Sequence, residues 1–274
     1  GGSISAGDII QYFVIAQDNY STPNVGVNTG LFNAPPVSVA LTATAFPVTG
    51  SINSYSISFN GTYFVGTGKY QSLTRSGGLF EAISSGSLSG NVEIKITTNL
   101  SEDGTHQLTQ WQESGTGNYT LTISPQSNEM KIISGSSETG LIKITGCSRV
   151  VINGQFSNNE YNLTFRNSNS NAPVFYFSEG SQANILHYLI IESASNNIDN
   201  AAIKFGLGNN SRNTILNCQI GDIEGSASTP GQGILLSGAG NNEIEIKDNS
   251  FRNFGTAAIV LNGGCSNTLI EGNE

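Results

Sequence analysis

The fold is decided by the stretch from Ala202 to Leu216, which reads AIKFGLGNNSRNTIL. It holds two short apolar runs, at 202–205 and 214–216, separated by a turn rich in Gly and Asn. Runs this short, bounded by turn residues, are typical of β-strands rather than of amphipathic helices. The stretch therefore predicts two consecutive strands joined by an asparagine-rich turn.

The same pattern recurs over most of the chain. A first series of apolar segments aligns on five residues at intervals of 25 to 33: Ile142, Phe175, Ile203, Ile234 and Ile259. A second series follows each of these after about ten residues, around positions 151, 185, 215, 245 and 269. A third strand is expected near Phe156, Ile191, Ile220 and Phe251. A period of this length is the signature of a solenoid, in which each repeat stacks on its neighbours.

Short strands in every repeat favour an all-β fold, the right-handed parallel β-helix, in which each coil adds about 4.8 Å of length. Leucine-rich repeats are excluded because their Leu and Asn spacing is missing. Helical repeats are excluded because Gly, Asn and Ser are abundant. In this register Phe205 points into the core. Asn210 lies in a turn, where substitution is expected to be tolerated unless its side chain bonds the backbone.

Ahead of the repeats, residues 66–83 contain a segment with helical spacing. Leu79, Phe80 and Ile83 lie at positions i, i+1 and i+4, and the sequence Ser-Ser-Gly at 84–86 follows as a stop signal. A stack of coils exposes an unpaired strand edge at its end, and such an edge needs a cover. We expect a short helix that caps the first coil, followed by strands at 92–96 and 119–123.

The stretch GTYFVG at 61–66, continued to Ile83, resembles the opening of β-helix modules in large secreted surface proteins of the Bacteroidetes type. The later coils are similar to the pectate-lyase-like β-helix repeat. Together these resemblances cover about three quarters of the chain. They imply a β-helix over residues 62–274 that is incomplete at its C-terminal end. They also imply a secreted protein, located outside the cell or on its outer surface.

Residues 1–48 differ in character and are expected to form part of a sandwich domain. The stretch 8–18 is predicted to be a long strand, with 37–43 as its hairpin partner. Both resemble the last strands of a fibronectin type III or immunoglobulin-like domain, with Tyr12 as a candidate tyrosine corner. Because two strands alone are marginal in water, we expect a β-hairpin remnant, joined to the β-helix by a linker over 49–61.

The charge balance and hydropathy limit the partners. Lys and Arg total 11 against 20 Asp and Glu, which gives a formal net charge of −9. Such a chain repels nucleic acid on average. No apolar run reaches the 18 residues of a membrane helix, so we expect no membrane insertion. Both termini look like cuts in a longer chain, whose other domains would be neighbours of this one.

No metal, cofactor or nucleophile site is predicted. Cys147 and Cys265 follow equivalent strands four coils apart, or about 19 Å, whereas a disulfide needs Cα atoms within about 7 Å. Cys218 belongs to another wall, so three free thiols are expected. His106 and His187 fall in different coils, and neither has a partner at metal-ligand spacing.

The motifs of polysaccharide-cleaving β-helices are missing as well. Polygalacturonase-type enzymes carry an Asp-Asp pair, Gly-His-Gly and Arg-x-Lys, and none of these occurs here. Pectate-lyase-type enzymes need calcium-binding acids with an Arg or Lys base. Asp222 and Glu224 could face one way from a strand, with Asp199 one coil earlier, but acids in turns are usually solvated. We therefore predict no catalytic residue.

The first series of strands offers one candidate carbohydrate-binding surface. Alternation along the strands sends Tyr176 outward, together with Lys143 and Lys204 from the neighbouring coils. A tyrosine flanked by two lysines could stack on a sugar and would favour an acidic glycan. Equally, Leu235 and Val260 at the same position of later coils favour a partly covered face, on which Tyr176 only packs.

Two functions remain open. The first is a noncatalytic surface or adhesin module, an elongated spacer that contacts extracellular polysaccharide or another cell surface. The second is a polysaccharide lyase or glycoside hydrolase whose site lies partly beyond Glu274. The missing catalytic motifs favour the first, since a fold by itself does not imply an activity.

Overall fold

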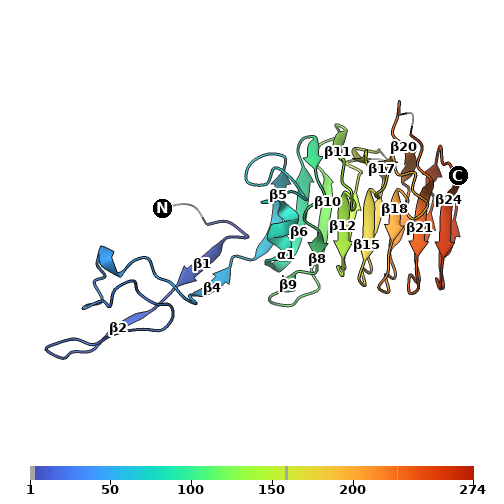
Figure 1. The fold of residues 1–274 in the computed structure, drawn as a ribbon. Coiled ribbons are helices and arrows are strands. Elements are labelled where there is room, and N and C mark those ends of the chain that lie inside the picture. The colour runs from blue at the N-terminus through green and yellow to red at the C-terminus, as the bar shows by residue number, and fades with distance from the viewer. Residues whose placement is uncertain (1–3, 158–159, 227) are drawn as a thin grey trace. The chain divides into compact units, whose positions relative to one another are not determined.

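The structure is a computed structural model that describes residues 4–157, 160–226 and 228–274 (Figure 1). The chain divides into two compact units, Gly1–Ile57 and Ser58–Glu274. Among the residues described, no helix has the length and hydropathy needed to cross a bilayer. The second unit contains the repeats and the candidate site.

The second unit is a parallel β-helix of about seven coils, as the repeats predict. Successive coils add one strand to each of three walls, and equivalent strands pair in parallel. Wall 1 contains β5 (Phe59–Val65), β6 (Ser87–Ile96), β10 (Leu121–Pro125), β13 (Val150–Asn153), β16 (Ile185–His187), β19 (Thr214–Leu216), β22 (Glu245–Lys247) and β25 (Leu269–Glu271), with β9 (Gln112–Glu113) beside β6. Wall 2 contains β7 (Leu100–Glu102), β11 (Lys131–Gly135), β14 (Leu163–Asn167), β17 (Leu189–Ser193), β20 (Gln219–Asp222) and β23 (Ser250–Phe251). Wall 3 contains β8 (Leu108–Thr109), β12 (Ile142–Thr145), β15 (Phe175–Ser178), β18 (Ile203–Phe205), β21 (Gln232–Ser237) and β24 (Ala257–Asn262).

The register of wall 3 confirms the alignment of the first strand series. Phe175 lies opposite Ile142 on one side and Ile203 on the other, and all three are fully buried. Phe177 and Phe205 stack in the core with ring centroids 4.7 Å apart and an interplanar angle of 12°. Because side chains alternate along a strand, burying this set exposes the residues between them on the outer face.

Wall 2 confirms the predicted third strands at Ile191, Ile220 and Phe251, whereas the prediction at Phe156 is wrong. In that coil the third strand is β14, and Phe156 is 52% exposed in the preceding turn. Phe165 takes the core position instead, in register with Ile133 and Ile191. Extra residues between β13 and β14 displace the strand along the sequence, because turns accept insertions at little entropic cost.

Buried asparagines line the corners between the walls. Asn210 is fully buried, and its Oδ1 accepts a hydrogen bond from the backbone N–H of Ser181 at 3.1 Å. Its Nδ2 donates to the Gly206 carbonyl and to Asn241 Oδ1, both at 2.9 Å. Equivalent amide pairs are Asn184–Asn213 and Asn249–Asn273. The Asn210 side chain therefore does bond the backbone, and it satisfies buried polar groups that a turn would otherwise leave unpaired.

The predicted capping helix is present as α1 (Leu79–Ser84), in contact with β6 and β8 (Figure 1). Its apolar residues Leu79, Phe80 and Ile83 are fully buried. The segment before the helix is held by Glu102 of β7, which is 2% exposed. Its carboxylate accepts four hydrogen bonds from residues 72–74. Apolar burial and one buried carboxylate thus fasten the cap.

The described part of the first unit, residues 4–57, contains two antiparallel strand pairs. β1 (Ile9–Tyr12) pairs with β4 (Asn53–Ser56), and β2 (Ile15–Gln17) pairs with β3 (Val25–Val27). The predicted partner at 37–43 is wrong, because these residues form bends that follow two prolines and lead into a short 3-10 helix at Ala43–Ala45. Tyr12 is 46% exposed and lies 6.1 Å from Tyr55 between ring centroids.

All three cysteines are free thiols in the structure, with Cys147 and Cys218 buried and Cys265 partly exposed. Burial raises the pKa of the Cys147 and Cys218 thiols to about 12, and it raises that of Cys265 less.

We expect an aromatic disulfide reagent to modify Cys265 in the folded protein and all three cysteines after denaturation without reductant, since the thiolate is the reactive form. Detection of a single thiol in the denatured chain would instead reveal a disulfide.

Candidate functional site

Tyr176, Lys143 and Lys204 lie side by side on the outer face of wall 3. Tyr176 of β15 pairs in register with Lys143 of β12 and with Lys204 of β18. All three side chains are half-buried. The register that buries Phe175 and Phe177 turns Tyr176 outward, and the stacking of coils then places one lysine on each side of it.

The ring of Tyr176 leans across the neighbouring coil. A Cβ atom added to Gly206 would lie 2.5 Å from Tyr176 Oη and 2.8 Å from Cε2. Cβ atoms do not approach other atoms so closely, so the ring occupies the space that a side chain at position 206 would need. Lys204 Nζ lies 5.8 Å from the ring centroid, within the range of a cation–π interaction.

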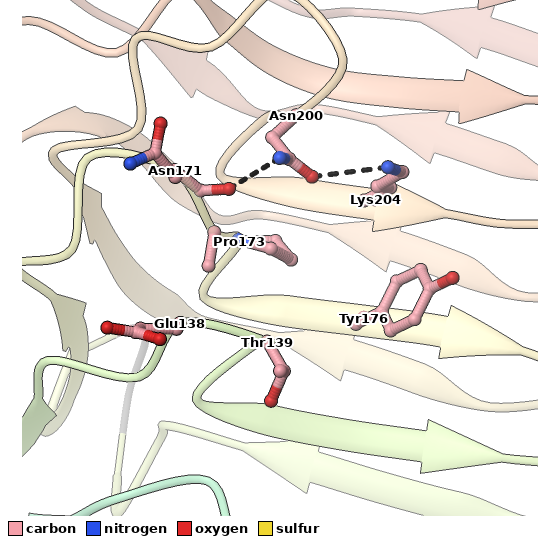
Figure 2. Close-up of a pocket in the computed structure, with 8 residues that line it drawn as sticks. Glu138, Thr139, Asn171, Pro173, Tyr176, Asn200 and Lys204 are labelled. Atoms are coloured by element: carbon pink, nitrogen blue, oxygen red, sulfur yellow. Dashed lines mark hydrogen bonds between the residues drawn. The ribbon is translucent and has the colours of Figure 1, made fainter.

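A pocket of about 270 Å³ opens beside this ring (Figure 2). Tyr176 and Lys204 contribute to it from strands, and the turns that precede wall 3 supply the rest of its lining: Glu138, Thr139, Asn171, Ala172, Pro173 and Asn200. Figure 2 shows Glu138 at one end of the pocket and Tyr176 and Lys204 toward the other. Its lining combines the apolar surfaces of Ala172, Pro173 and the Tyr176 ring with polar and charged groups that could fix the orientation of a ligand.

The two lysines have different surroundings. Lys204 lines the pocket, and its Nζ donates to the Asp199 carbonyl at 2.7 Å and to Asn200 Oδ1 at 3.2 Å. Lys143 Nζ donates to Thr139 Oγ1 at 3.3 Å, and Lys143 is not part of the pocket lining. Burial lowers the pKa of both ammonium groups. Of the two lysines, Lys204 lines the pocket itself, whereas Lys143 reaches the pocket through the lining residue Thr139.

The turn residues of the pocket were not predicted from the sequence. Thr139, Ala172 and Asn200 occupy the same position in three successive coils, at a fixed offset before the outward strand residue. That offset is visible in the repeat alignment and could have identified them. The hydrogen bond from Asn200 Nδ2 to the Asn171 carbonyl, 2.5 Å long, depends on the conformation of two turns and could not (Figure 2).

The two histidines lie apart from this pocket. His106 Nε2 is 3.4 Å from Glu81 Oε2. His187 Nε2 is 3.3 Å from Asn217 Nδ2, and the His187 ring centroid is 4.3 Å from that of Tyr188. Burial lowers the pKa of His187, which favours its neutral form. Each histidine thus has a local partner that accounts for its position.

The acids considered from the sequence have separate surroundings: Asp222, Glu224 and Asp199. Asp222 Oδ1 lies 3.4 Å from Arg252 Nε, and Arg252 also contacts Glu192 at 3.3 Å. Glu192 is buried between Arg252 and Arg166, whose Nη2 lies 2.6 Å from Glu192 Oε2. Glu224 and Asp199 are exposed. On the outer face of wall 2, positive and negative charges therefore compensate one another.

Within the described part of the chain, no group of three or more His, Cys, Asp and Glu side chains is placed to hold a metal ion. No protein-family model matches the chain, and neither a curated protein nor a solved structure matches it. A functional assignment therefore depends on the geometry of the site, since the β-helix fold does not specify an activity.

Proposed function

We propose that the β-helix is a noncatalytic module of a secreted surface protein, an elongated spacer that contacts carbohydrate at the pocket beside Tyr176. The observation that carries the proposal is the half-buried tyrosine ring, which borders a pocket lined also by two amides, a hydroxyl, two charged groups and the apolar side chains of Ala172 and Pro173. A sugar has an apolar C–H face and a rim of hydroxyls, and this pocket offers a complement to each. The partner would be an extracellular polysaccharide or the surface of another cell.

The resemblance to pectate-lyase-like β-helices and to Bacteroidetes-type surface proteins is part of this proposal, as is the extracellular location. It would place the unit among other domains of a long chain, with the fibronectin-like remnant at residues 1–48 as one neighbour. Coil stacking supports the spacer role, because each added coil lengthens the module by about 4.8 Å without altering its cross-section.

A lyase or hydrolase is the weaker alternative for this pocket. Glycoside hydrolysis uses two carboxyl groups about 5–9.5 Å apart on either side of the scissile bond. The pocket lining contains one carboxylate, that of Glu138, and Glu138 is exposed. The positive group, Lys204, already donates to two oxygens of its own turn. These surroundings suit binding and orientation better than proton transfer.

A glycan array tests the proposal directly. We expect the protein to bind a subset of glycans, and the Tyr176→Ala variant to bind them about tenfold more weakly or worse, because truncating a central aromatic contact typically removes 1–2 kcal/mol or more. Tyr20→Ala is a matched control, since Tyr20 is 75% exposed in the first unit. Binding that survives Tyr176→Ala would place the site elsewhere, and an empty array would leave only the spacer role.

A further inference from the structure

We propose that the pocket takes a single acidic sugar residue, whose ring lies on Tyr176 and whose anionic group binds Lys204, and that Gly206 is the residue that positions the tyrosine ring. The inference rests on the proposed function and specifies its ligand and its orientation. Three features of the site carry it, namely the space at position 206, the unequal roles of the two lysines and the dimensions of the pocket.

Gly206 controls how the aromatic ring is presented. The Tyr176 side chain reaches over position 206, where an added Cβ would lie 2.5–2.9 Å from three atoms of the phenol group. With glycine there, the phenol can rest against the backbone of the next coil and keep its opposite side free. Stacking on a sugar requires such an accessible ring face. The backbone at Gly206 does not adopt a left-handed conformation, so its lack of a side chain, rather than its flexibility, is what the site uses.

The charges of the pocket define the orientation of the ligand. Lys204 Nζ lies close to the Tyr176 ring and on the pocket lining, and two oxygens of its own turn hold it there. Glu138 lies at the end away from Lys204 (Figure 2). An anionic group would be attracted to the Lys204 end and repelled from the Glu138 end. Partial burial of the ammonium group strengthens this attraction, because water screens it less.

The dimensions of the pocket limit what it can hold. Pockets for drug-sized ligands usually enclose about 300–1,000 Å³. At about 270 Å³, this pocket lies just below that range. One residue of a longer glycan therefore fits better than an extended oligosaccharide. The remainder of the glycan would follow the outer face of wall 3.

The test is calorimetry on pairs of oligosaccharides that differ in one feature, the anionic group. Uronic-acid and sialylated oligosaccharides are paired with their carboxyl-reduced forms, and sulfated ones with their desulfated forms. The pairs also distinguish a carboxylate ligand from a sulfate ligand. The variants are Lys204→Gln, Gly206→Ala, Lys143→Gln to compare the two lysines, and, as the matched control, Lys247→Gln on wall 1, whose ammonium group pairs with Glu245. A thermal midpoint measured for each variant verifies that it folds.

We expect the acidic member of at least one pair to bind about fivefold or more tightly than its neutral form, the scale of a well-placed ion pair. Lys204→Gln should abolish that difference, whereas Lys143→Gln should retain it. Gly206→Ala should weaken both members while leaving the thermal midpoint nearly unchanged. In a Tyr176→Ala background it should have no further effect on binding, which a merely structural role would not predict.

Each contrary outcome has a distinct meaning. Equal binding of acidic and neutral forms through Tyr176 would overturn the anion assignment and leave the proposed function standing. Equal effects of Lys143→Gln and Lys204→Gln would overturn the assignment of the charge to Lys204. Unchanged binding in Gly206→Ala would overturn its positioning role. If no oligosaccharide binds at all, the carbohydrate-binding part of the proposed function fails, and this inference fails with it.

Discussion

Phe205→Ala is expected to reduce the free energy of unfolding by about 3–5 kcal/mol, the usual cost of emptying a large aromatic site in a core. Phe205 is fully buried, and its ring stacks on Phe177 of the preceding coil at 4.7 Å. The stability of a solenoid is approximately the sum of the intrinsic stability of each repeat and the stability of each interface between neighbouring repeats. A cavity at one interface therefore weakens the coupling between the coils on its two sides.

The thermal midpoint provides the measurement. In a unit of this size each kcal/mol shifts the midpoint by about 2–4 °C, so a decrease of about 6–20 °C is expected. Leu207→Ala is the control, because Leu207 follows two residues later and is 72% exposed. Exposed substitutions usually change stability by less than about 0.5 kcal/mol. Similar shifts in the two variants would contradict the inward assignment of Phe205.

The wall-3 register could be predicted because each coil repeats the same alternation of inward and outward residues. Outward Lys204 stands between inward Ile203 and Phe205, and the same inward–outward order recurs one coil earlier around Tyr176. In a parallel stack, equivalent positions of successive coils become neighbours. An alignment of five short segments therefore specified contacts between residues far apart in the chain. The same alignment predicts that Tyr176 lies between Lys143 and Lys204, as the register of wall 3 confirms.

Other features depend on interactions that no local pattern encodes. Phe156 is as apolar as Phe165, and only the packing of the stack decides which of the two enters the core. The pairing of β1 with β4 joins segments separated by a long stretch of chain, for which the sequence offers several partners. Asn210 lies in a sequence that reads as a simple turn. Its side chain can be buried because Asn241, one coil later, accepts a hydrogen bond from its amide group.

The candidate site also combines features that the sequence predicts with features that it does not. The outward position of Tyr176 follows from alternation, but the unequal surroundings of Lys143 and Lys204 come from the turns, whose conformations the repeat does not specify. Gly206 illustrates the limit most clearly. Nothing in the sequence distinguishes it from the other glycines of the chain. The structure does, because the Tyr176 ring occupies the space that a side chain at position 206 would need.

Glu102→Ala is expected to weaken the cap at the first coil. The carboxylate accepts hydrogen bonds from Leu73 N–H at 2.8 Å, Thr74 N–H at 2.8 Å, Thr74 Oγ1 at 2.7 Å and Ser72 Oγ at 2.5 Å. Removing it leaves these four donors without that acceptor, each at a cost of about 1–3 kcal/mol, so a total loss of about 4 kcal/mol or more is expected. Glu102→Gln should lose less, because it retains one acceptor oxygen.

The location of the lost hydrogen-exchange protection distinguishes local opening of the cap from destabilisation of the whole unit. Hydrogen exchange should accelerate first at Leu73, Thr74 and α1, since local openings expose the segments with the weakest attachment. Glu129→Ala is the matched control: Glu129 pairs with Lys131 at 2.6 Å, but its side chain is 76% exposed. Exposed ion pairs contribute at most about 1 kcal/mol, so this variant should keep the cap protected. Uniform acceleration along all coils in Glu102→Ala would show that the cap unfolds only with the whole stack. Exchange confined to 72–84 would establish the cap as a separately detachable cover, whose loss exposes the edge of the first coil to other chains.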